Sequence, residues 1–554
     1  MLKNKKLWII ILLLFIIPSF FRLLRPGFFP IQDDMQVFRL FEMDKCFQDF
    51  QIPCRWIPDG GYQYGYPQFN FYAPGVYYFG EIIHLIGFQF IDSIKILFIL
   101  GFVFSGITMF ILAREFFGNF PALIASLLYT YAPYHAQQVY VRGSLSEFWA
   151  SVFFPLILWG LYKLIHDGGK RYILWTAVSI AGLFLTHNIL SFLFIPIAVF
   201  WTAFWLYFVK KAGLKKIFLG IVLGLGLSAF FVLPMITERA DVHVETLLGG
   251  YFDYRQHFVS LKELFISNHW GYGSSALGPI DDLSLSTGIV HWIIGVAGIL
   301  IALFKYKKDR KTSLLILGLG VIEFVILFLM HEKSSFIWSR LTFLSWLQFP
   351  WRFLSLSVFI LSFLSAYAVF SLPKLKYIIG AVAVIAVLIL HVGFFAPSAW
   401  LNINDKDKLT GDAWEKDLTA SIFDYLPIYA KLPPNHKAPD APEVLDGNAI
   451  FVKYEKGSYF QKGEVKVYKD ATIRVPLYDF PGMEVRIDGK IADHVNNDCR
   501  NQKFCLGLIT FKIPEGIHKV SVALRNTPIR LTGNIITLIS FMAVISLIHK
   551  KKND

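Results

Sequence analysis

The sequence predicts a polytopic α-helical membrane protein, with about 12 transmembrane helices and a C-terminal external β-sandwich-like domain. Hydrophobic residues make up 55% of the 554 residues, and a soluble protein of this composition would expose more apolar surface than water tolerates. Apolar runs of about 18 residues, the length that crosses a bilayer core, recur along the chain. The one large polar block, residues 396–528, shows the alternation of β-strands in EVKVYKDATIRV and HKVSVAL, and Asp488-Gly489 within MEVRIDGK predicts a turn between strands.

The apolar runs predict the membrane spans in order along the chain. They lie at residues 7–24, 93–113, 120–134, 147–164, 172–187, 190–209, 217–236, 288–304, 313–330, 351–370, 377–395 and 531–548. The net charge of +13 gathers in short lysine and arginine clusters between these runs, which is the pattern of cytoplasmic loops. The clusters account for much of the positive charge, so the expected partner is the lipid bilayer of the cytoplasmic membrane and not nucleic acid.

Counting spans from the basic clusters predicts the topology, with both termini in the cytoplasm. Residues 72–90 are long enough to cross, but the count lays them along the outer surface. Their Glu81 and His84 suit an interfacial helix better than the middle of a membrane. The predicted domains are a transmembrane domain at 1–395 with external loops at 25–92 and 237–287, an external β-rich domain at 396–528, and a last span with a basic cytoplasmic tail at 529–554.

The cysteines fall in two close pairs, Cys46 with Cys54 and Cys499 with Cys505. Neither pair lies in a predicted span, and neither has the spacing of a zinc site. Because both pairs fall in regions predicted to face an oxidising compartment, we expect two local disulfides. Four free thiols are the alternative.

Two adjacent aspartates follow the first span in the stretch PIQDDMQVFRLF. Asp33 fits the N-cap of a helix that lies on the membrane surface, because Gln36 completes a capping box three residues later. A cap uses only one carboxylate, which leaves Asp34 at the membrane–water boundary. There Asp34 is placed to act as a general base on a hydroxyl, or to ligate a divalent cation such as Mg²⁺ or Mn²⁺. A purely structural role for the pair is the alternative.

Further polar and aromatic residues belong to the same predicted external face. The candidates for substrate binding are Arg39, Arg55, Trp56, Tyr66, Arg142, Glu147, His187, Asn188, Trp270, Gln348, Trp351 and Arg352. Arginine and histidine bind phosphate, and aromatic rings pack against the C–H faces of a sugar. Each residue also has a local explanation: the aromatic residues as an interfacial belt, Trp351 and Arg352 as interface anchors, and Arg142 with Glu147 as a structural ion pair.

Five stretches taken together resemble a known family. They are QDDMQVFRLFEMDKCFQDFQIPCRW, GYPQFNFYAPGVYY, VRGSLSE, LTHN and LQFPWRFL, and they resemble bacterial membrane proteins labelled 6-pyruvoyl-tetrahydropterin synthase-related. The predicted layout is one span, then an external loop with an acidic motif, then a bundle and an external domain. This layout resembles the GT-C superfamily of glycosyltransferases. The chain carries Gln32 where members of the labelled family have histidine before the two aspartates.

The resemblance implies a membrane glycosyltransferase. A sugar would pass from a polyprenyl-phosphate-linked donor to a glycan, lipid or protein acceptor outside the cytoplasm. Asp34 would be the general base or metal ligand, supported by Asp33, while Arg142 and Arg352 would neutralise the donor phosphate.

A non-enzymatic function is the rival hypothesis. Glu323 lies in the middle of a predicted span, which suits a proton-coupled transporter of lipid-linked glycans. The chain shows no inverted halves, which disfavours a transporter fold. A membrane scaffold whose β domain binds an envelope polymer is the other non-enzymatic possibility.

Overall fold

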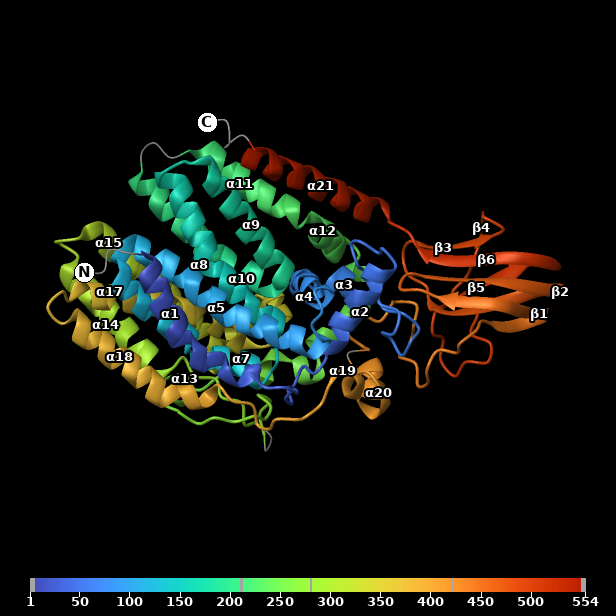
Figure 1. Ribbon diagram of the computed structural model, residues 1–554, viewed down its shortest axis with the longest axis horizontal. Coiled ribbons are helices and arrows are strands. Elements are labelled where there is room, and N and C mark those ends of the chain that lie inside the picture. Colours follow the sequence, from blue (N-terminus) through green and yellow to red (C-terminus); the bar gives the residue numbers. More distant parts are fainter. Residues whose placement is uncertain (1–4, 210–212, 279–280, 421, 550–554) are drawn as a thin grey trace.

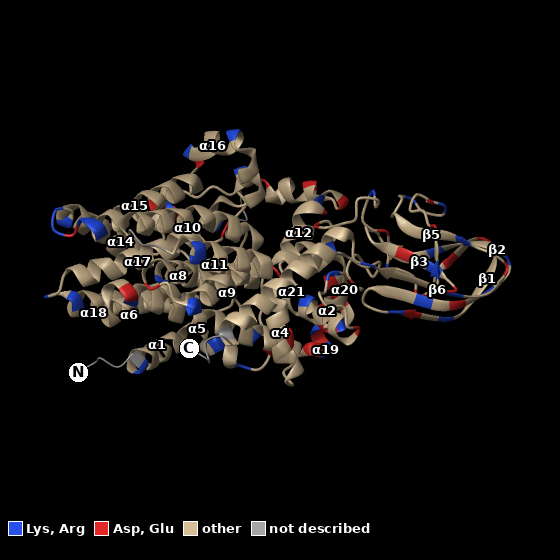
Figure 2. Cartoon of the chain, turned by 90° about the horizontal axis from the view of Figure 1, so that it is seen from above, with Lys and Arg blue, Asp and Glu red and all other residues tan. Residues whose placement is uncertain are grey.

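The computed structural model describes residues 5–209, 213–278, 281–420 and 422–549, and it joins a helical bundle to a β-sheet along the long axis of the molecule (Figure 1). Short helices from the stretch after the first span lie between the two parts. Charged residues gather at the loops that end the bundle and on the sheet, whereas the bundle helices are largely free of them along their length (Figure 2). This distribution is typical of helices that cross a bilayer.

Each predicted span contains at least one helix. The helices are α1 (Lys5–Phe20), α5 (Phe90–Phe117), α6 (Asn119–Thr130), α8 (Leu145–His166), α9 (Lys170–Thr186), α10 (Asn188–Phe208), α11 (Leu214–Leu227) with α12 (Ala229–Thr237), α14 (Ile289–Lys305), α15 (Arg310–Met330), α17 (Leu354–Ser371), α18 (Lys376–His391) and α21 (Pro528–His549). In the described part of the chain, 8 helices are long and apolar enough to cross a membrane, or 9 if α11 and α12 form one span bent by 69°. The predicted membrane protein is confirmed.

Three of the predicted spans correspond to helices that are short for a bilayer. Helices α6, α9 and α14 have 12, 17 and 17 residues, less than the roughly 20 that a bilayer core requires. Helix α6 ends at Thr130 because Pro133 starts a separate helix, α7 (Pro133–Tyr140), and proline is favoured in a first helical turn but not inside a helix. Apolar runs alone do not reveal such a break.

The remaining helices are short and lie outside the spans. They are α2 (Gln36–Gln48), α3 (Gln68–Phe71), α4 (Gly75–Leu85), α13 (Leu261–Phe265), α16 (Ser335–Arg340), α19 (Asp405–Lys408) and α20 (Gly411–Thr419). The 11 residues of α4 cannot cross a bilayer, which agrees with the prediction that residues 72–90 do not span. One face of α4 is buried, while Ile82, Leu85 and Ile86 on the other are exposed, as in an interfacial helix.

The C-terminal strands form one antiparallel sheet. They are β1 (Glu443–Lys456), β2 (Phe460–Tyr478), β3 (Met483–Ile487), β4 (Lys490–Ala492), β5 (Leu508–Ile513) and β6 (Gly516–Leu524). Strand β2 pairs with β1 on one edge and with β6 and β5 in turn on the other, and β3 and β4 continue beyond β6. The predicted turn joins β3 to β4, with positive φ at both Asp488 and Gly489, as in a type I′ hairpin.

The buried face of the sheet packs on the loop that follows the first span. Trp56, Tyr64 and Phe71 share one hydrophobic core with the sheet residues Val475 and Val522. The sheet is therefore anchored to the stretch that carries the two aspartates. Both predicted disulfides, Cys46–Cys54 and Cys499–Cys505, are present.

Glu81 makes the stability of this region depend on pH. Its carboxyl is buried on α4, and burial together with nearby Asp44 raises its pKa to about 8, against an ordinary value of about 4.3. The folded state thus favours the protonated form, so stability is full below about pH 4 and falls as the pH rises towards 8. We expect the unfolding temperature of the wild type to drop by about 2–5 °C between pH 5 and pH 8.5 on this account.

The variant Glu81→Gln, which imitates the protonated side chain, should lose this drop in thermal unfolding followed by fluorescence. Glu332→Gln is the control, because the Glu332 side chain is exposed, and it should keep the slope of the wild type. Equal slopes in wild type and Glu81→Gln would contradict the assignment.

Candidate functional site

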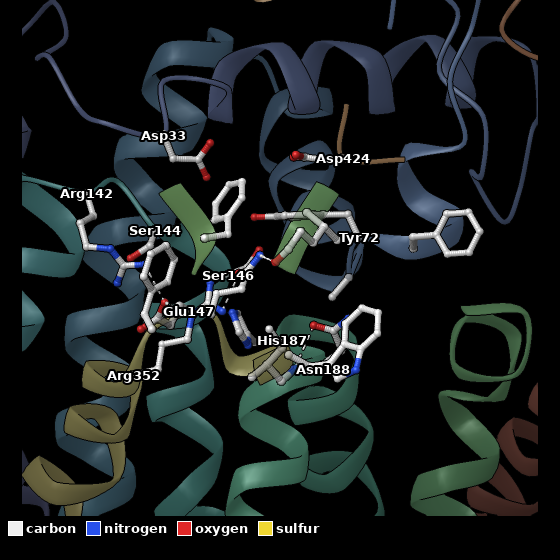
Figure 3. A pocket seen from close by; sticks show the side chains of 18 of the residues that line it. Asp33, Tyr72, Arg142, Ser144, Ser146, Glu147, His187, Asn188, Arg352 and Asp424 are labelled. Carbon is white, nitrogen blue, oxygen red and sulfur yellow. Dashed lines mark hydrogen bonds and ion pairs between the residues drawn. The ribbon is translucent and has the colours of Figure 1, made fainter. Parts of the chain in front are cut away.

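A cavity of about 1090 Å³ lies where the bundle meets the loop after the first span. It collects nine of the predicted site residues: Asp33, Arg39, Arg142, Glu147, His187, Asn188, Gln348, Trp351 and Arg352. Figure 3 labels Asp33, Arg142, Glu147, His187, Asn188 and Arg352 among them, and their side chains come from separate helices and loops. The lining also includes large apolar side chains, namely Ile189, Phe192, Met235, Ile236, Leu247 and Trp346.

Asp33 presents its carboxylate to the cavity (Figure 3). Its Oδ2 accepts hydrogen bonds from Gln36 Nε2 at 2.8 Å and from Arg39 Nη1 at 2.9 Å. Among the described residues, no hydrogen bond to Oδ1 is formed, and the side chain is 34% exposed. Asp33 therefore keeps one carboxylate oxygen available to accept a proton from a bound molecule.

The predicted cap at Asp33 is wrong. Helix α2 starts at Gln36, and its N-cap is Met35, which makes no side-chain cap. The carboxylate of Asp33 bonds instead to two side chains of α2, because Gln36 and Arg39 lie on one face of the helix, three residues apart.

Asp34 faces away from the cavity lining. Its Oδ1 lies 2.6 Å from Lys408 Nζ, and the Lys408 side chain is 8% exposed. The structure thus reverses the positions expected for the two aspartates. Lys408 is on α19, about 370 residues further along the chain, so no local sequence pattern connects it with Asp34.

Backbone hydrogen bonds fix the aspartates beside the turn between α7 and α8. The N–H of Asp33 donates to the carbonyl of Arg142 at 2.9 Å, and the N–H of Gln32 donates to that of Val141 at 3.0 Å. The Gln32 side chain donates to the carbonyl of Gly273 at 2.6 Å. Gln32 therefore joins the stretch that carries the two aspartates to the loop at residues 237–287.

Two arginines share one buried carboxylate next to Asp33. Glu147 Oε2 lies 2.9 Å from Arg142 Nη2 and 3.8 Å from Arg352 Nε. The other oxygen, Oε1, accepts a hydrogen bond from Tyr134, and the Arg142 guanidinium lies over the Trp351 ring at 4.4 Å. This cluster carries a net charge of about +1 in a buried setting, where it attracts an anion more strongly than at a surface.

Gln348 orients Arg352. Its Oε1 accepts from Arg352 Nη1 at 2.9 Å, while its Nε2 donates to the carbonyl of Leu247 at 3.0 Å. Gln348 has a φ of 62°, a conformation that costs energy for a residue with a side chain. Such strain persists where the surrounding contacts require it, here at the turn between η7 (Thr342–Leu347) and η8 (Pro350–Phe353).

His187 is neutral and lies between α9 and α10. Burial lowers its pKa to about 3, against the opposing effect of Glu147, and the positive charges of Arg352 and Arg142 add to the lowering. Its Nδ1 accepts a hydrogen bond from the N–H of Leu190, so the proton is on Nε2. His187 is therefore a neutral hydrogen-bond donor in the cavity wall.

Four of the residues predicted to bind substrate do not line the cavity. Arg55 bonds to Asn534 on α21 and to the carbonyl of Phe230 on α12. Trp56 is buried beneath the sheet. Tyr66 accepts from the N–H of Tyr425, and Trp270 stacks on Phe394 at 4.5 Å.

The cavity lining also includes residues that were not among the predicted ones, and three of these are charged or carry a hydroxyl next to Arg39: Tyr72, Arg239 and Asp424 line the cavity as well. Tyr72 lies under the Arg39 guanidinium at 4.4 Å, and its place in the aromatic stretch FNFYAPGVYY was the signal that could have found it. Asp424 reaches the cavity from the segment that precedes the sheet, and no sequence pattern indicates this.

Lys408→Met should destabilise the protein at the stretch that carries Asp33 and Asp34. It removes the cation from Asp34 and leaves that carboxylate partly buried, so we expect a loss of about 1–2 kcal/mol of unfolding free energy. Lys406→Met is the control, because Lys406 is on the same short helix but exposed. Chemical unfolding in detergent measures both variants, and equal stabilities would show that the Lys408–Asp34 pair is not structural.

No family model matches the sequence, so the resemblance to the 6-pyruvoyl-tetrahydropterin synthase-related proteins rests on the quoted motifs. Over 210 residues the chain is 27% identical to an uncharacterized protein of Lactococcus lactis subsp. cremoris (strain MG1363). That match covers 36% of this chain and 34% of the relative.

Two solved sugar transferases have a similar arrangement. The Archaeoglobus fulgidus oligosaccharyltransferase in its apo form aligns with a TM-score of 0.47 and 17% identity, over 75% of this chain and 59% of that one. The arabinofuranosyltransferase AftD from Mycobacteria aligns with a TM-score of 0.47 and 14% identity, over 72% of this chain and 27% of that one. The chain thus spans less than two thirds of either structure. Structural similarity with such low sequence identity and TM-score assigns no activity to this chain. A proposal for its activity has to rest on the residues of the cavity.

Proposed function

We propose that the chain is an integral membrane glycosyltransferase, which transfers a sugar from a polyprenyl-phosphate-linked donor to an acceptor outside the cytoplasm. The observation that carries the proposal is the composition of one cavity. It combines a carboxylate with a free oxygen at Asp33, a buried arginine cluster of about +1 charge and large apolar side chains in the lining. A lipid-linked sugar phosphate needs these three environments together.

The charge of the arginine cluster matches a phosphodiester. Arg142 and Arg352 share Glu147, so the surplus is about one positive charge. A sugar joined to a polyprenyl chain through a single phosphate carries one negative charge. A diphosphate donor carries more than this cluster balances, so the proposed donor is the monophosphate.

The apolar side chains that line the cavity would bind the lipid chain of the donor. Phe192 on α10, Ile236 on α12 and Trp346 on η7 line the cavity and are also 49%, 46% and 38% exposed. Large apolar side chains exposed on a bundle that crosses a membrane face lipid. A polyprenyl tail would leave the cavity between these residues and enter the bilayer.

The proposed reaction is a single displacement. Asp33 Oδ1 accepts the proton of the acceptor hydroxyl, whose oxygen then bonds to the anomeric carbon of the sugar. The bond from that carbon to the phosphate oxygen breaks, and the electron pair stays on the phosphate. Arg142 and Arg352 stabilise the released polyprenyl phosphate, and His187 Nε2 donates a hydrogen bond to it. One displacement inverts the anomeric carbon.

The membrane setting follows the same proposal. The cavity side would face outward from the cytoplasmic membrane, both termini would be cytoplasmic, and the acceptor would be a glycan, lipid or protein. Glu323, the residue that suggested a transporter, accepts a hydrogen bond from Ser357 between α15 and α17 and does not line the cavity. No observation favours transport over transfer.

Transfer from a radiolabelled donor tests the function. The full chain in lipid nanodiscs would receive polyprenyl-phosphate sugars with envelope glycans or lipids as acceptors, and the products would be separated by chromatography. We expect labelled product and release of polyprenyl phosphate in equal amounts. Donor hydrolysis without product, or no consumption of any donor tested, would contradict the proposal.

A further inference from the structure

Each of the two aspartates that suggested a metal site already forms an ion pair with a basic side chain. Asp33 Oδ2 lies 2.9 Å from Arg39 Nη1, and Asp34 Oδ1 lies 2.6 Å from Lys408 Nζ. Among the described residues, no group of three or more His, Cys, Asp or Glu is placed to hold a metal ion. Mg²⁺ and Mn²⁺ require oxygen ligands in a near-octahedral shell, so the residues of this site do not fit the predicted divalent cation.

Arg39 is held in place as a fixed positive charge. Its side chain is only 4% exposed, and its guanidinium lies over the ring of Tyr72 at 4.4 Å. Gln36, on the same face of α2, shares the bond to Asp33 and is itself held by Tyr77, whose hydroxyl donates to Gln36 Oε1 at 2.7 Å. A dication on Asp33 would have to lie beside this guanidinium, and the two like charges would repel each other.

We propose that this site works without a divalent metal, and that Arg39 is the positioning residue that takes the place of the ion. The inference rests on the proposed function. Arg39 acts through Asp33: it holds Oδ2 in place, which leaves Oδ1 to accept the proton of the acceptor. Arg142 and Arg352 stabilise the charge that develops on the leaving phosphate. In a metal-dependent site, a bound metal would contribute to this stabilisation.

Metal binding tests the inference without any assay of transfer. Mn²⁺ would be titrated into the full chain in nanodiscs, and free Mn²⁺ would be followed by electron paramagnetic resonance. We expect the wild type to bind no more Mn²⁺ than the variants Asp33→Asn and Asp34→Asn. One tightly bound Mn²⁺ per wild-type chain, lost in either variant, would overturn the inference. The wild-type titration decides the question even if a variant fails to fold.

Transfer assays give a second readout. We expect wild-type transfer to change less than about twofold when EDTA is added, and Arg39→Gln to lower it by about 100-fold. Arg39→Lys should recover at least a tenth of the wild-type rate, because the positive charge is restored although the stacking on Tyr72 is not. Arg255→Gln is the control, since Arg255 is exposed and pairs only with Asp253 among the described residues.

The two proposals fail in different ways. Loss of transfer in EDTA, restored by Mn²⁺, would overturn the metal-free site and leave the glycosyltransferase standing. Arg39→Lys as inactive as Arg39→Gln would show a packing role in place of a charge role. If the wild type transfers no sugar, the proposed function fails, and the Mn²⁺ titration still decides whether the site takes a metal.

Discussion

Asp33→Asn is expected to lower sugar transfer by about 10²–10⁴-fold, the range that a positioned general base contributes. The amide has nearly the same shape and keeps an oxygen for Arg39, so the protein should still fold, with some loss of stability because the buried Arg39 loses its counterion. It cannot accept the proton of the acceptor hydroxyl, because its nitrogen has no free lone pair and its carbonyl is a weak base. Initial rates with saturating donor, together with unfolding temperatures, measure the effect.

Asp34→Asn is the matched comparison. Asp34 pairs with Lys408 outside the cavity, so its amide variant should lose about tenfold or less in rate, with some loss of stability. If both variants fold and Asp34→Asn loses more rate than Asp33→Asn, Asp34 and not Asp33 would be the general base.

Glu147→Gln is expected to destabilise the protein by about 3–5 kcal/mol. The Glu147 side chain is 2% exposed and faces both Arg142 and Arg352. Removing its charge leaves two buried cations next to each other without a counterion. Chemical unfolding in detergent, monitored by tryptophan fluorescence, measures the loss.

A double variant separates the charge from the shape of Glu147. In Glu147→Gln combined with Arg142→Gln, one of the two uncompensated cations is gone, so part of the stability should return. Additive losses in the double variant would show that the pair is not coupled. Glu332→Gln, on an exposed side chain, should be neutral.

Much of the fold could be predicted because hydrophobic length and charge clusters act locally. The spans, the interfacial helix at residues 72–90, the disulfide pairs and the Asp488–Gly489 turn each depend on residues close in the sequence. The prediction was too long for α6, because apolarity continues through the break before Pro133. Local composition marks where a helix is apolar but not where a buried chain turns.

The division of roles between Asp33 and Asp34 could not be predicted. A capping pattern was present at Asp33, but Arg39 and Gln36 compete for the same carboxylate and hold it in the cavity. Lys408, which holds Asp34, comes from a segment that folds back after the last span of the main bundle. A side chain so distant in sequence leaves no periodic signal near the aspartates.

The sequence by itself determined a membrane protein with an acidic motif after its first span and a β-rich domain near its end, since bilayer length and strand alternation are properties of short stretches. Only the tertiary structure decided that Asp33 enters the cavity, that Arg142 and Arg352 share Glu147, and that Arg39 lies where a metal was expected. These facts depend on which helices pack together. The packing depends on the whole chain, because a charge buried in a low-dielectric interior needs a counterion, and that counterion can come from a segment far away in the sequence.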